Sequence, residues 1–579
     1  MRAKSRFWEY FFVFIFFACC WMWLAFAIPS LVEFKEHVSA FIFGPQLISN
    51  YISKPAFLSV LTGDFLTQFF YLHKYAGPTV MTILYVILWL GLTRSFILCG
   101  AGKAACHTAL LPVAVEMFLA NYINYPVSAT VASVLSVWTA LFCMKAGKER
   151  LRIMLFLLAM VVSYHLVCGA YTIVLLFLYG LFYRRKPVVV AVGIAAVVLG
   201  MTISGLCCNL SLVGTVLYPV VPGYKLPNTA FFLLIPSIVL VSGLFSLILR
   251  PWLGILTTTL AFFASLYTSY DYTTEYMVTM NIHAGRRNWE KVWQMAVEAP
   301  DDYFYGYFYR NLCLAREGCL PDRLLDYQQI PEGGMNVPVS QGMDYLWYFA
   351  SVDQLMEVGD ISQATGCALL CQTIMPGGHS THMLRRLAEL SMIAGDTDVA
   401  RKYLGILSHN LVHRQWARQM SEYLDKGEIP DELEHFRRIS SKTDHIFLQS
   451  DWEGSLLSLT ATSPDNRTAL DYLLCSYLLA KKTRSFVIHY DRYYHGRFDI
   501  DGQAPELYQE ALLSTATNRA DYLKIVSRYK IDSSVSSRYD RFLDAFSNSG
   551  GVVSNLNEFK GTYWHYIVSH NLSSLNTSE

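Results

Sequence analysis

Residues 188–208 read VVVAVGIAAVVLGMTISGLCC, an uninterrupted run of 21 residues without a charged side chain. A helix needs about 20 predominantly apolar residues to cross the hydrocarbon core of a bilayer. Similar runs lie on both sides of this one, at Trp8–Ile28, Pro78–Leu98, Ala104–Tyr122, Val127–Met144, Ala230–Leu249 and Trp252–Tyr270. The sequence therefore predicts an all-α protein, with a polytopic transmembrane bundle in residues 1–270 and a soluble α-helical part after it.

The charged residues divide the chain at the same place. Residues 1–270 contain 17 Lys and Arg and only 6 Asp and Glu, whereas residues 271–579 contain 29 and 39. Carboxylates are scarce in segments that lie in hydrocarbon, because a charge there is costly. The second part has the composition of an ordinary globular chain and enough length for a packed core. Neither part is basic enough to indicate nucleic acid as a partner.

One apolar stretch, Ile153–Tyr183, is too long for a single ordinary crossing. Basic residues bracket it at both ends, and cytoplasmic loops collect Lys and Arg, so both ends are expected on the same side of the membrane. Two short helices that turn near Tyr164, His165 and Gly169 satisfy this requirement, whereas one long helix does not. With this hairpin the predicted bundle has about nine spans.

The basic residues also predict the orientation of the bundle. With the N-terminus in the cytoplasm, 13 Lys and Arg fall in cytoplasmic segments and 4 in outer segments. An odd number of spans then places residues 271–579 outside, which for a bacterial inner-membrane protein is the periplasm. A single helix over 153–183 would instead return this part to the cytoplasm. Ala25–Ala27 resembles a signal-peptidase site, so cleavage after Ala27 stays open.

A glycine-centred turn recurs through the first part of the soluble tail. The spacings are 33, 41, 36 and 32 residues, and the glycines are Gly285, Gly318, Gly359, Gly395 and Gly427. Glycine suits the left-handed residue that ends a helix, and an Asp after it caps the next helix. The pattern resembles tetratricopeptide-type repeats, whose period is about 34 residues. We predict a repeat domain over 271–430 and a C-terminal helical extension over 431–579. The repeats either dock protein partners or only pack against the membrane part.

Two further stretches carry a family resemblance over nearly the whole chain. They are GDFLTQFFY at Gly63–Tyr71 and NLCLAREGCLPDR at Asn311–Arg323. They make the chain similar to an uncharacterised family of polytopic inner-membrane proteins from Bacteroides-like bacteria. The resemblance implies an envelope protein of this architecture and brings no known activity.

The loop between the first two spans, residues 29–77, holds the carboxylates Glu33, Glu36 and Asp64. Apolar residues at helical spacing in 57–70 predict a helix at the membrane interface. The chain resembles the GT-C-type transferases, which use polyprenyl-phosphate sugars, in span count, loop position and soluble tail. That resemblance implies an acidic residue in this loop as general base or metal ligand. The loop lacks a clear DxD or ExD pair, and solvated carboxylates are the competing interpretation.

Four more residues are candidates for chemistry. Glu116 falls inside a predicted span, where a carboxylate must face a cavity or a polar partner. His165, at the outer turn of the predicted hairpin, is in position to meet Glu116 or the outer loop, and otherwise serves the turn itself. Arg286 and Arg287 follow the last span, where they either neutralise a lipid phosphate or begin a solvated helix. The sequence shows no phosphate-binding glycine loop and no paired His ligands, so we predict no cofactor and no metal.

These features favour two functions of different kinds. The first is a membrane-embedded envelope protein whose periplasmic repeats dock protein partners. The second is a membrane transferase that acts on a lipid-linked substrate at the outer face, with one of the carboxylates Glu33, Glu36, Asp64 and Glu116 as its catalytic group. The repeats favour the first function, because they are the motif that recurs, whereas the many spans and the outer loop favour the second.

Overall fold

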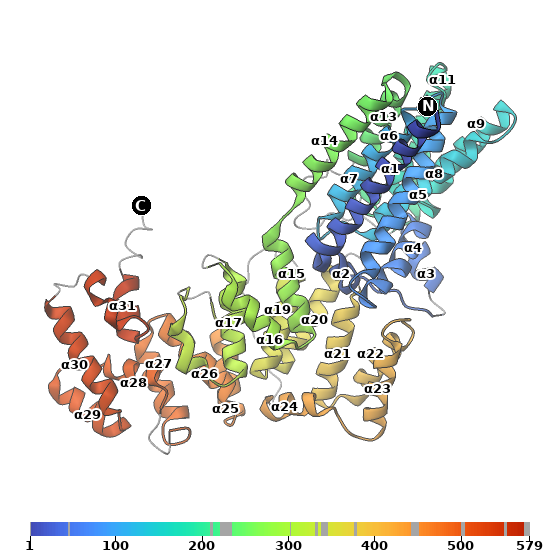
Figure 1. Ribbon diagram of the computed structural model, residues 1–579. Helices are drawn as coiled ribbons and strands as arrows, with labels where there is room; N and C mark the ends of the chain where they lie inside the picture. Colours follow the sequence, from blue (N-terminus) through green and yellow to red (C-terminus); the bar gives the residue numbers. More distant parts are fainter. Residues whose placement is uncertain are drawn as a thin grey trace. The chain divides into compact units, whose positions relative to one another are not determined.

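The computed structural model describes residues 2–44, 47–208, 212–220, 234–300, 303–330, 334–336, 345–375, 379–441, 451–499, 504–548 and 553–571. Within these ranges every assigned element is a helix, which confirms the all-α prediction (Figure 1). The chain divides into two compact units. The first unit contains Met1–Thr279, Gln372–Ala388 and Arg401–Lys426, and the second contains Met280–Cys371, Glu389–Ala400 and Gly427–Glu579.

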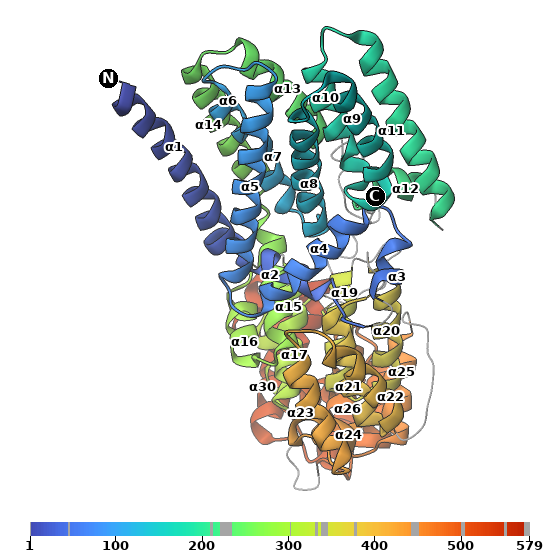
Figure 2. The same ribbon diagram turned by 90° about the vertical axis from the view of Figure 1, so that its right-hand side faces the viewer.

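The first unit contains a bundle of apolar helices (Figure 2). Four of them are long and apolar enough to cross a membrane, namely α5 (Ala76–Leu98), α8 (Val127–Met144), α11 (Pro187–Cys207) and α14 (Pro251–Ser269). A fifth candidate is bent by 74°, where α1 (Arg2–Met22) passes through the π-helical turn η1 (Trp23–Ala27) into α2 (Pro29–His37). The other helices are shorter or more polar: α6 (Ala105–Thr108), α7 (Leu110–Ala120), α9 (Glu149–Leu166), η3 (Gly169–Tyr171), α10 (Thr172–Phe182), α12 (Leu212–Leu217) and α13 (Leu234–Ile248).

This count corrects the prediction of about nine spans. By length and composition the described residues hold four membrane-length helices, or five with the bent pair. The run at 104–122 is divided between α6 and α7, and the run at 230–249 gives a helix of 15 residues, α13, with residues 230–233 outside the described part. At 1.5 Å per residue, such helices reach about 17–23 Å, less than the ~30 Å hydrocarbon core. α9 is long enough but begins with three charged residues, Glu149, Arg150 and Arg152.

The break predicted in Ile153–Tyr183 is present. α9 ends at Leu166, and α10 begins at Thr172 after the short turn η3. Gly169 in this turn has a φ of +54°, and a Cβ atom there would lie 2.5 Å from the carbonyl oxygen of Tyr218. Only glycine fits this position without moving the backbone. The stretch therefore folds as two helices.

The loop at 29–77 is largely helical. It contains α2, α3 (Leu47–Ile52), α4 (Phe57–Thr67) and η2 (Gln68–Tyr71). α4 confirms the helix predicted in 57–70, and it packs closely against α8. A Cβ atom on Gly63 would lie 2.5 Å from the Cα atom of Ser128, so glycine allows the two helices to approach.

The tail continues as paired helices. In chain order they are α15 (Tyr272–Gly285), α16 (Trp289–Glu298), α17 (Phe304–Arg316), α18 (Leu320–Arg323), η5 (Leu324–Asp326), α19 (Tyr345–Val358), α20 (Ile361–Ile374), α21 (Thr381–Ala394), α22 (Thr397–Ser408), α23 (Arg414–Asp425), α24 (Asp431–Ile439), α25 (Trp452–Thr462), α26 (Arg467–Leu479), α27 (Thr483–His489), η6 (Tyr490–Tyr494), α28 (Glu506–Leu513), α29 (Arg519–Tyr529), α30 (Ser533–Asn548), η7 (Val553–Phe559) and α31 (Tyr563–Asn571).

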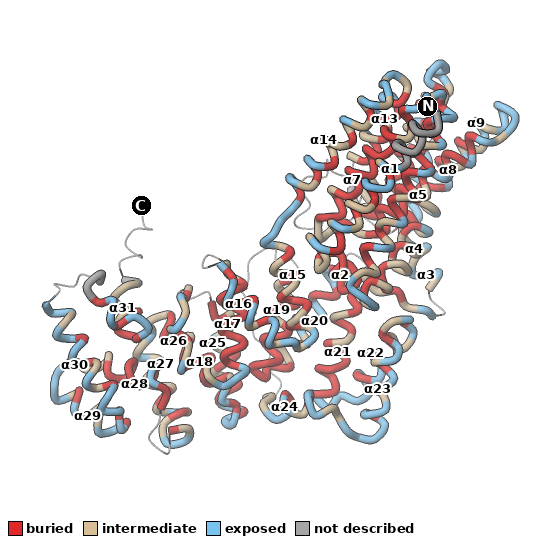
Figure 3. Tube along the Cα trace, in the orientation of Figure 1, coloured by how far each residue is buried: buried red, intermediate tan, exposed pale blue. Residues whose placement is uncertain are grey.

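Four of the five predicted glycine turns have left-handed backbone at a helix end. The φ angles of Gly318, Gly359, Gly395 and Gly427 are +72°, +87°, +85° and +72°. At the remaining turn Gly285 is the last residue of α15, and the positive φ, +56°, belongs to Arg287. Figure 3 shows the buried residues along the inner faces of the helices in each unit. The glycine pattern therefore located the ends of these helix pairs correctly.

Candidate functional site

A buried polar site of the first unit is built on α2. This helix carries Lys35, Glu36 and His37, each at most 4 % exposed. Its N-terminus is capped from a distance, because the backbone N–H groups of Ser30 and Leu31 donate to the two carboxylate oxygens of Glu275 at 2.8 and 2.9 Å. A negative charge is favourable at a helix N-terminus. Burial nevertheless raises the pKa of Glu275 to about 7, and these two hydrogen bonds only partly offset it.

Lys35 fastens the same helix to the end of α7. Its Nζ atom donates to the carbonyl oxygens of Tyr125 at 2.7 Å and Tyr122 at 3.2 Å. These carbonyls follow the C-terminus of α7, where the helix dipole favours a cation. Burial lowers the pKa of Lys35 to about 7, since water no longer solvates the ammonium.

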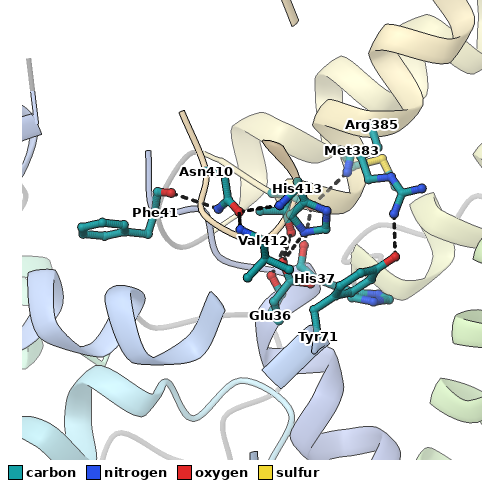
Figure 4. A network of polar contacts seen from close by, with 11 residues as sticks. Glu36, His37, Phe41, Tyr71, Met383, Arg385, Asn410, Val412 and His413 are labelled. Carbon is teal, nitrogen blue, oxygen red and sulfur yellow. Dashed lines mark hydrogen bonds and ion pairs between the residues drawn. The ribbon is translucent and has the colours of Figure 1, made fainter. Parts of the chain in front are cut away.

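Glu36 makes the central contact, shown in Figure 4. Its Oε1 atom lies 2.8 Å from Nε2 of His413 and accepts a hydrogen bond of 2.7 Å from the Thr381 hydroxyl. Glu36 and His413 are 1 % and 2 % exposed. Burial alone would raise the pKa of Glu36, but the charge and hydrogen bond of His413, together with His37 and Thr381, lower it below the ordinary value.

Aromatic and cationic side chains surround this pair. The rings of His37 and His382 stack with centroids 5.0 Å apart, and the Tyr71 ring lies 4.6 Å from the ring of His413. Arg385 donates to the Tyr71 hydroxyl at 2.7 Å. Its guanidinium also lies 4.5 Å from the ring centroid of Trp416, a cation–π contact. We call the set that these contacts join the clasp: Glu36, His37, Tyr71, Thr381, His382, Arg385 and His413.

The clasp has the groups of an acid–base site but the burial of a structural one. A carboxylate and an imidazole within hydrogen-bonding distance can move a proton if a substrate reaches them. Here both are enclosed by protein atoms, and Oε1 of Glu36 is already shared by two donors. In the described part of the chain, no group of three or more His, Cys, Asp or Glu side chains is arranged to hold a metal. The geometry therefore fits fastening of the loop at 29–77 to α21 and α23.

The other predicted carboxylates of the loop lie elsewhere. Glu33 is half-buried on α2, and Asp64 on α4 accepts a hydrogen bond of 2.9 Å from the Tyr51 hydroxyl. Burial raises the pKa of Asp64 to about 7 against the lowering effects of Tyr51 and Lys54. The hydrogen bonds of Asp64 and those of Glu36 share no residue.

The titration of Asp64 leads to a prediction about pH. Its pKa in the folded protein, about 7, lies above the ordinary value of 3.8. The folded state therefore favours the protonated acid, and this contribution to stability is complete below pH 3.8 and lost as the pH rises through 7. We expect the Tm of Asp64→Asn to rise relative to that of the wild type between pH 5 and pH 8. A Tm difference that stays constant over this interval would contradict the prediction.

Glu116 is fully buried on α7 among hydroxyl groups. Its Oε2 atom accepts hydrogen bonds of 3.0 Å from Tyr125 and from Thr130, and its Oε1 atom accepts one from Ser133. The Tyr125 hydroxyl is also 2.8 Å from the hydroxyl of Tyr171. The sequence left a cavity or a polar partner open for this carboxylate, and the structure supplies hydroxyls from the loop after α7 and from α8.

The remaining candidates have separate surroundings. His165 lies 3.0 Å from the carbonyl oxygen of Ile52 in the outer loop, through Nε2, and 3.1 Å from the Ser204 hydroxyl, through Nδ1. Arg287, in the second unit, forms ion pairs with Glu389 at 3.0 Å and Glu432 at 3.1 Å. Arg286 is exposed. His165 thus meets the outer loop, one of the two partners expected for it, while Arg287 is neutralised by protein carboxylates.

The sequence did not indicate Thr381, His382, Arg385 or His413 as site residues. They lie more than 300 residues after Glu36 in the chain. No spacing rule connects residues at such a separation, and a Thr, an Arg and two His in amphipathic helical segments are unremarkable by themselves.

Comparisons with known proteins place the chain without assigning it an activity. A family model that describes a family of unknown function matches residues 4–569. No curated protein and no solved structure matches the chain.

Proposed function

The chain belongs to DUF6057, a family of unknown function, and we propose that it is a membrane-embedded envelope protein whose helical tail docks protein partners. The clasp carries this proposal. Its Glu36–His413 pair, the most promising acid–base pair of the outer loop, is enclosed and joins the loop to tail helices. The arrangement is that of a scaffold, in which the outer loop holds α21 and α23 in place.

The surface of the bundle supports a membrane location. Large apolar side chains are widely exposed on α8, α11 and α13, among them Phe142 at 72 %, Val188 at 75 %, Leu206 at 84 % and Ile248 at 79 %. Apolar exposure of this extent is unfavourable in water and favourable against lipid chains. The four long apolar helices supply lengths that match the bilayer.

Hydrogen bonds to the outer loop support a common side of the membrane for several helix ends of the bundle. The bonds join Lys35 to Tyr125 after α7, Ile52 to His165 at the end of α9, and Ser30 to Glu275 after α14. A chain path in which the helices of 11 to 15 residues also cross requires the flanking turns and local thinning of the bilayer to supply the missing length.

The same path gives the side of the tail. The outer loop follows the first apolar helix, and the clasp joins it to residues 381–413, so both lie on one face of the membrane. Among the described residues, no membrane-length helix follows Ser269. With the N-terminus in the cytoplasm, as the bias of basic residues indicates, the tail lies in the periplasm of the inner membrane.

Reporter fusions test this topology. We expect alkaline phosphatase to be active and green fluorescent protein dark when each is fused after Glu579. The opposite is expected after Lys148, because this basic loop faces the cytoplasm only if α6 and α7 together complete a crossing. Phosphatase activity after Lys148 would contradict a crossing by α6 and α7, and fluorescence after Glu579 would contradict the periplasmic tail.

Partner docking is assigned to the tetratricopeptide-like part of the tail, residues 271–430, with 431–579 as its extension. The left-handed glycine turns support this assignment, and so do Ala364 and Ala400, which are fully buried where paired helices approach. Stacked helix pairs of this kind present continuous surfaces to partner peptides.

Photo-crosslinking tests the docking function. A photoreactive amino acid replaces Leu369 on α20 or Val399 on α22, which are 45 % and 41 % exposed, or Leu543 on α30, which is 44 % exposed. We expect a discrete crosslinked product in cells from the first two positions and none from the third. Crosslinks from no position, or equal crosslinks from all three, would contradict docking through the repeats.

One observation favours the transferase alternative. Asp64 lies in the outer loop, and its pKa of about 7 is that of an effective general acid or base at neutral pH. If the protein transfers a sugar from a lipid carrier, a strain with Asp64→Asn loses an envelope glycan or accumulates a lipid-linked precursor by mass spectrometry. If it is a docking protein, the same strain keeps its glycan profile.

A further inference from the structure

Residues 39–43, between α2 and α3, have no assigned helix or turn and lie against the ends of tail helices of the first unit. These helix ends bind main-chain groups of this segment and of the last turn of α2, where the Glu36 carbonyl accepts from the Thr381 hydroxyl at 3.1 Å. The carbonyl of His37 accepts from the Ser380 hydroxyl, that of Ser39 from the Thr381 N–H at 3.2 Å, and that of Phe41 from the Asn410 amide at 3.0 Å. The N–H of Phe43 then donates to the His409 carbonyl at 3.0 Å.

Three of the bound positions, 39, 41 and 43, are spaced two residues apart. Successive residues of an extended chain point to opposite sides, so these three present one edge. His37 differs, because it is the last residue of α2 and Val38 after it has a φ of −98° and a ψ of 5°. The facing groups come from the turn before α21 and the turn between α22 and α23, which are turns of neighbouring helices. Because main-chain groups are recognised, this part of the contact accepts any extended sequence. Selectivity comes from Glu36, which is held at one end by His413, as Figure 4 shows, and by Thr381.

Hydrogen bonds within the turns orient the side chains of Asn410 and Ser380. The Asn410 side-chain oxygen accepts from the N–H groups of Val412 and His413 at 2.9 and 3.0 Å, which leaves its NH₂ group directed at Phe41. The Ser380 hydroxyl accepts from the Met383 N–H, which orients its proton toward His37. Both side chains are completely buried.

We propose that the turns around Ser380, Thr381, His409, Asn410 and His413 form a peptide-docking site for a segment in which a glutamate at a helix C-terminus is followed by a non-helical stretch, and that the chain's own residues 36–43 occupy it as an internal ligand. The inference rests on the proposed docking function and assigns a regulation to it. A partner peptide enters this site only by displacing the loop. The loop is tethered at both ends, so its effective concentration is about millimolar, and a free peptide at micromolar concentration does not compete.

The test uses the full chain in detergent micelles and a fluorescent peptide, FKEHVSAFIFG, with the sequence of residues 34–44. A loosened variant combines Glu36→Ala, which removes the carboxylate, with Phe43→Pro, which removes the N–H donor to His409. We expect no change in peptide anisotropy with the wild type at micromolar concentration and saturable binding with the loosened variant. A peptide with Ala in place of its Glu is expected to bind at least tenfold more weakly.

Two controls keep the outcome decisive. His413→Ala in the loosened background is expected to abolish the difference between the Glu and Ala peptides. If the loosened variant does not fold, a protease site inserted after Gly44 and cut in the folded wild-type sequence lowers the effective concentration of the loop instead. Absence of binding to either opened form, or equal binding of the two peptides, overturns the proposal. Neither result bears on crosslinks from Leu369 and Val399, which test docking itself.

Discussion

Glu36→Ala is expected to lower the stability of the first unit by about 3–5 kcal/mol, the usual cost of removing one partner from a buried ion pair. The substitution leaves His413 and the Thr381 hydroxyl without their shared acceptor in a site that water does not reach. It also removes one of the contacts that fasten the loop to α21 and α23. The measurements are the Tm in detergent and the rate of limited proteolysis between α2 and α3.

Two further variants separate the pair from its surroundings. Glu36→Gln keeps a side chain of the same shape with an acceptor oxygen. We therefore expect it to lower the stability of the first unit much less than Glu36→Ala does. In a double-mutant cycle, the changes that Glu36→Ala and His413→Ala make in the free energy of unfolding are expected to be non-additive by about 0.5–3 kcal/mol, because each substitution removes the same contact. Additive effects, or an unchanged Tm in Glu36→Ala, would show that the clasp does not stabilise the unit.

The second large effect is expected at Gly359 in the second unit. An alanine there must adopt a φ of +87°, at a cost of about 1–2 kcal/mol. Its Cβ atom would also lie 2.7 Å from the carbonyl oxygen of Ile439 and 2.9 Å from Nδ2 of Asn466, an overlap that costs about 1–3 kcal/mol. Asn466 has no room to move, because its Nδ2 donates to the carbonyls of Val358 and Ile439 and its Oδ1 caps α26 through Ala469.

Gly395→Ala is the matched control for this prediction. Its φ is +85°, nearly the same angle, but no atom lies within 4 Å of the added Cβ. Gly395→Ala is therefore expected to lose only the free energy that the positive φ costs an alanine. Gly359→Ala is expected to lower the Tm clearly further. Equal losses of Tm in the two variants would mean that Asn466 and Ile439 move to admit the added Cβ atom at no cost in free energy.

Local rules explain what was predicted correctly. The break in Ile153–Tyr183 and the glycine turns of the tail both follow from the conformational freedom of glycine and from the length of the apolar runs. The span count failed for a related reason. An apolar run indicates burial in some apolar environment, but its length in sequence does not fix where helix ends fall, as the division of 104–122 into α6 and α7 shows.

The candidate site was predicted only in part. The outer loop was singled out and Glu36 named, because carboxylates are scarce in the first 270 residues. The sequence treated Glu33, Glu36 and Asp64 as equivalent members of one loop. The structure gives each a separate environment: half-buried on α2, bonded to His413 and Thr381, and bonded to Tyr51.

By itself the sequence determined the helical class, the apolar bundle, the helix pairs of the tail and the left-handed glycine at four of its five predicted turns, since these depend on hydrophobic length and on backbone sterics within a few residues. Only the tertiary structure decided that Glu36 meets His413, that Glu275 caps α2, and that residues 38–44 lie across the ends of α21 to α23. Those contacts join residues hundreds of positions apart, and their free energy exists only after the chain has folded and excluded water from them.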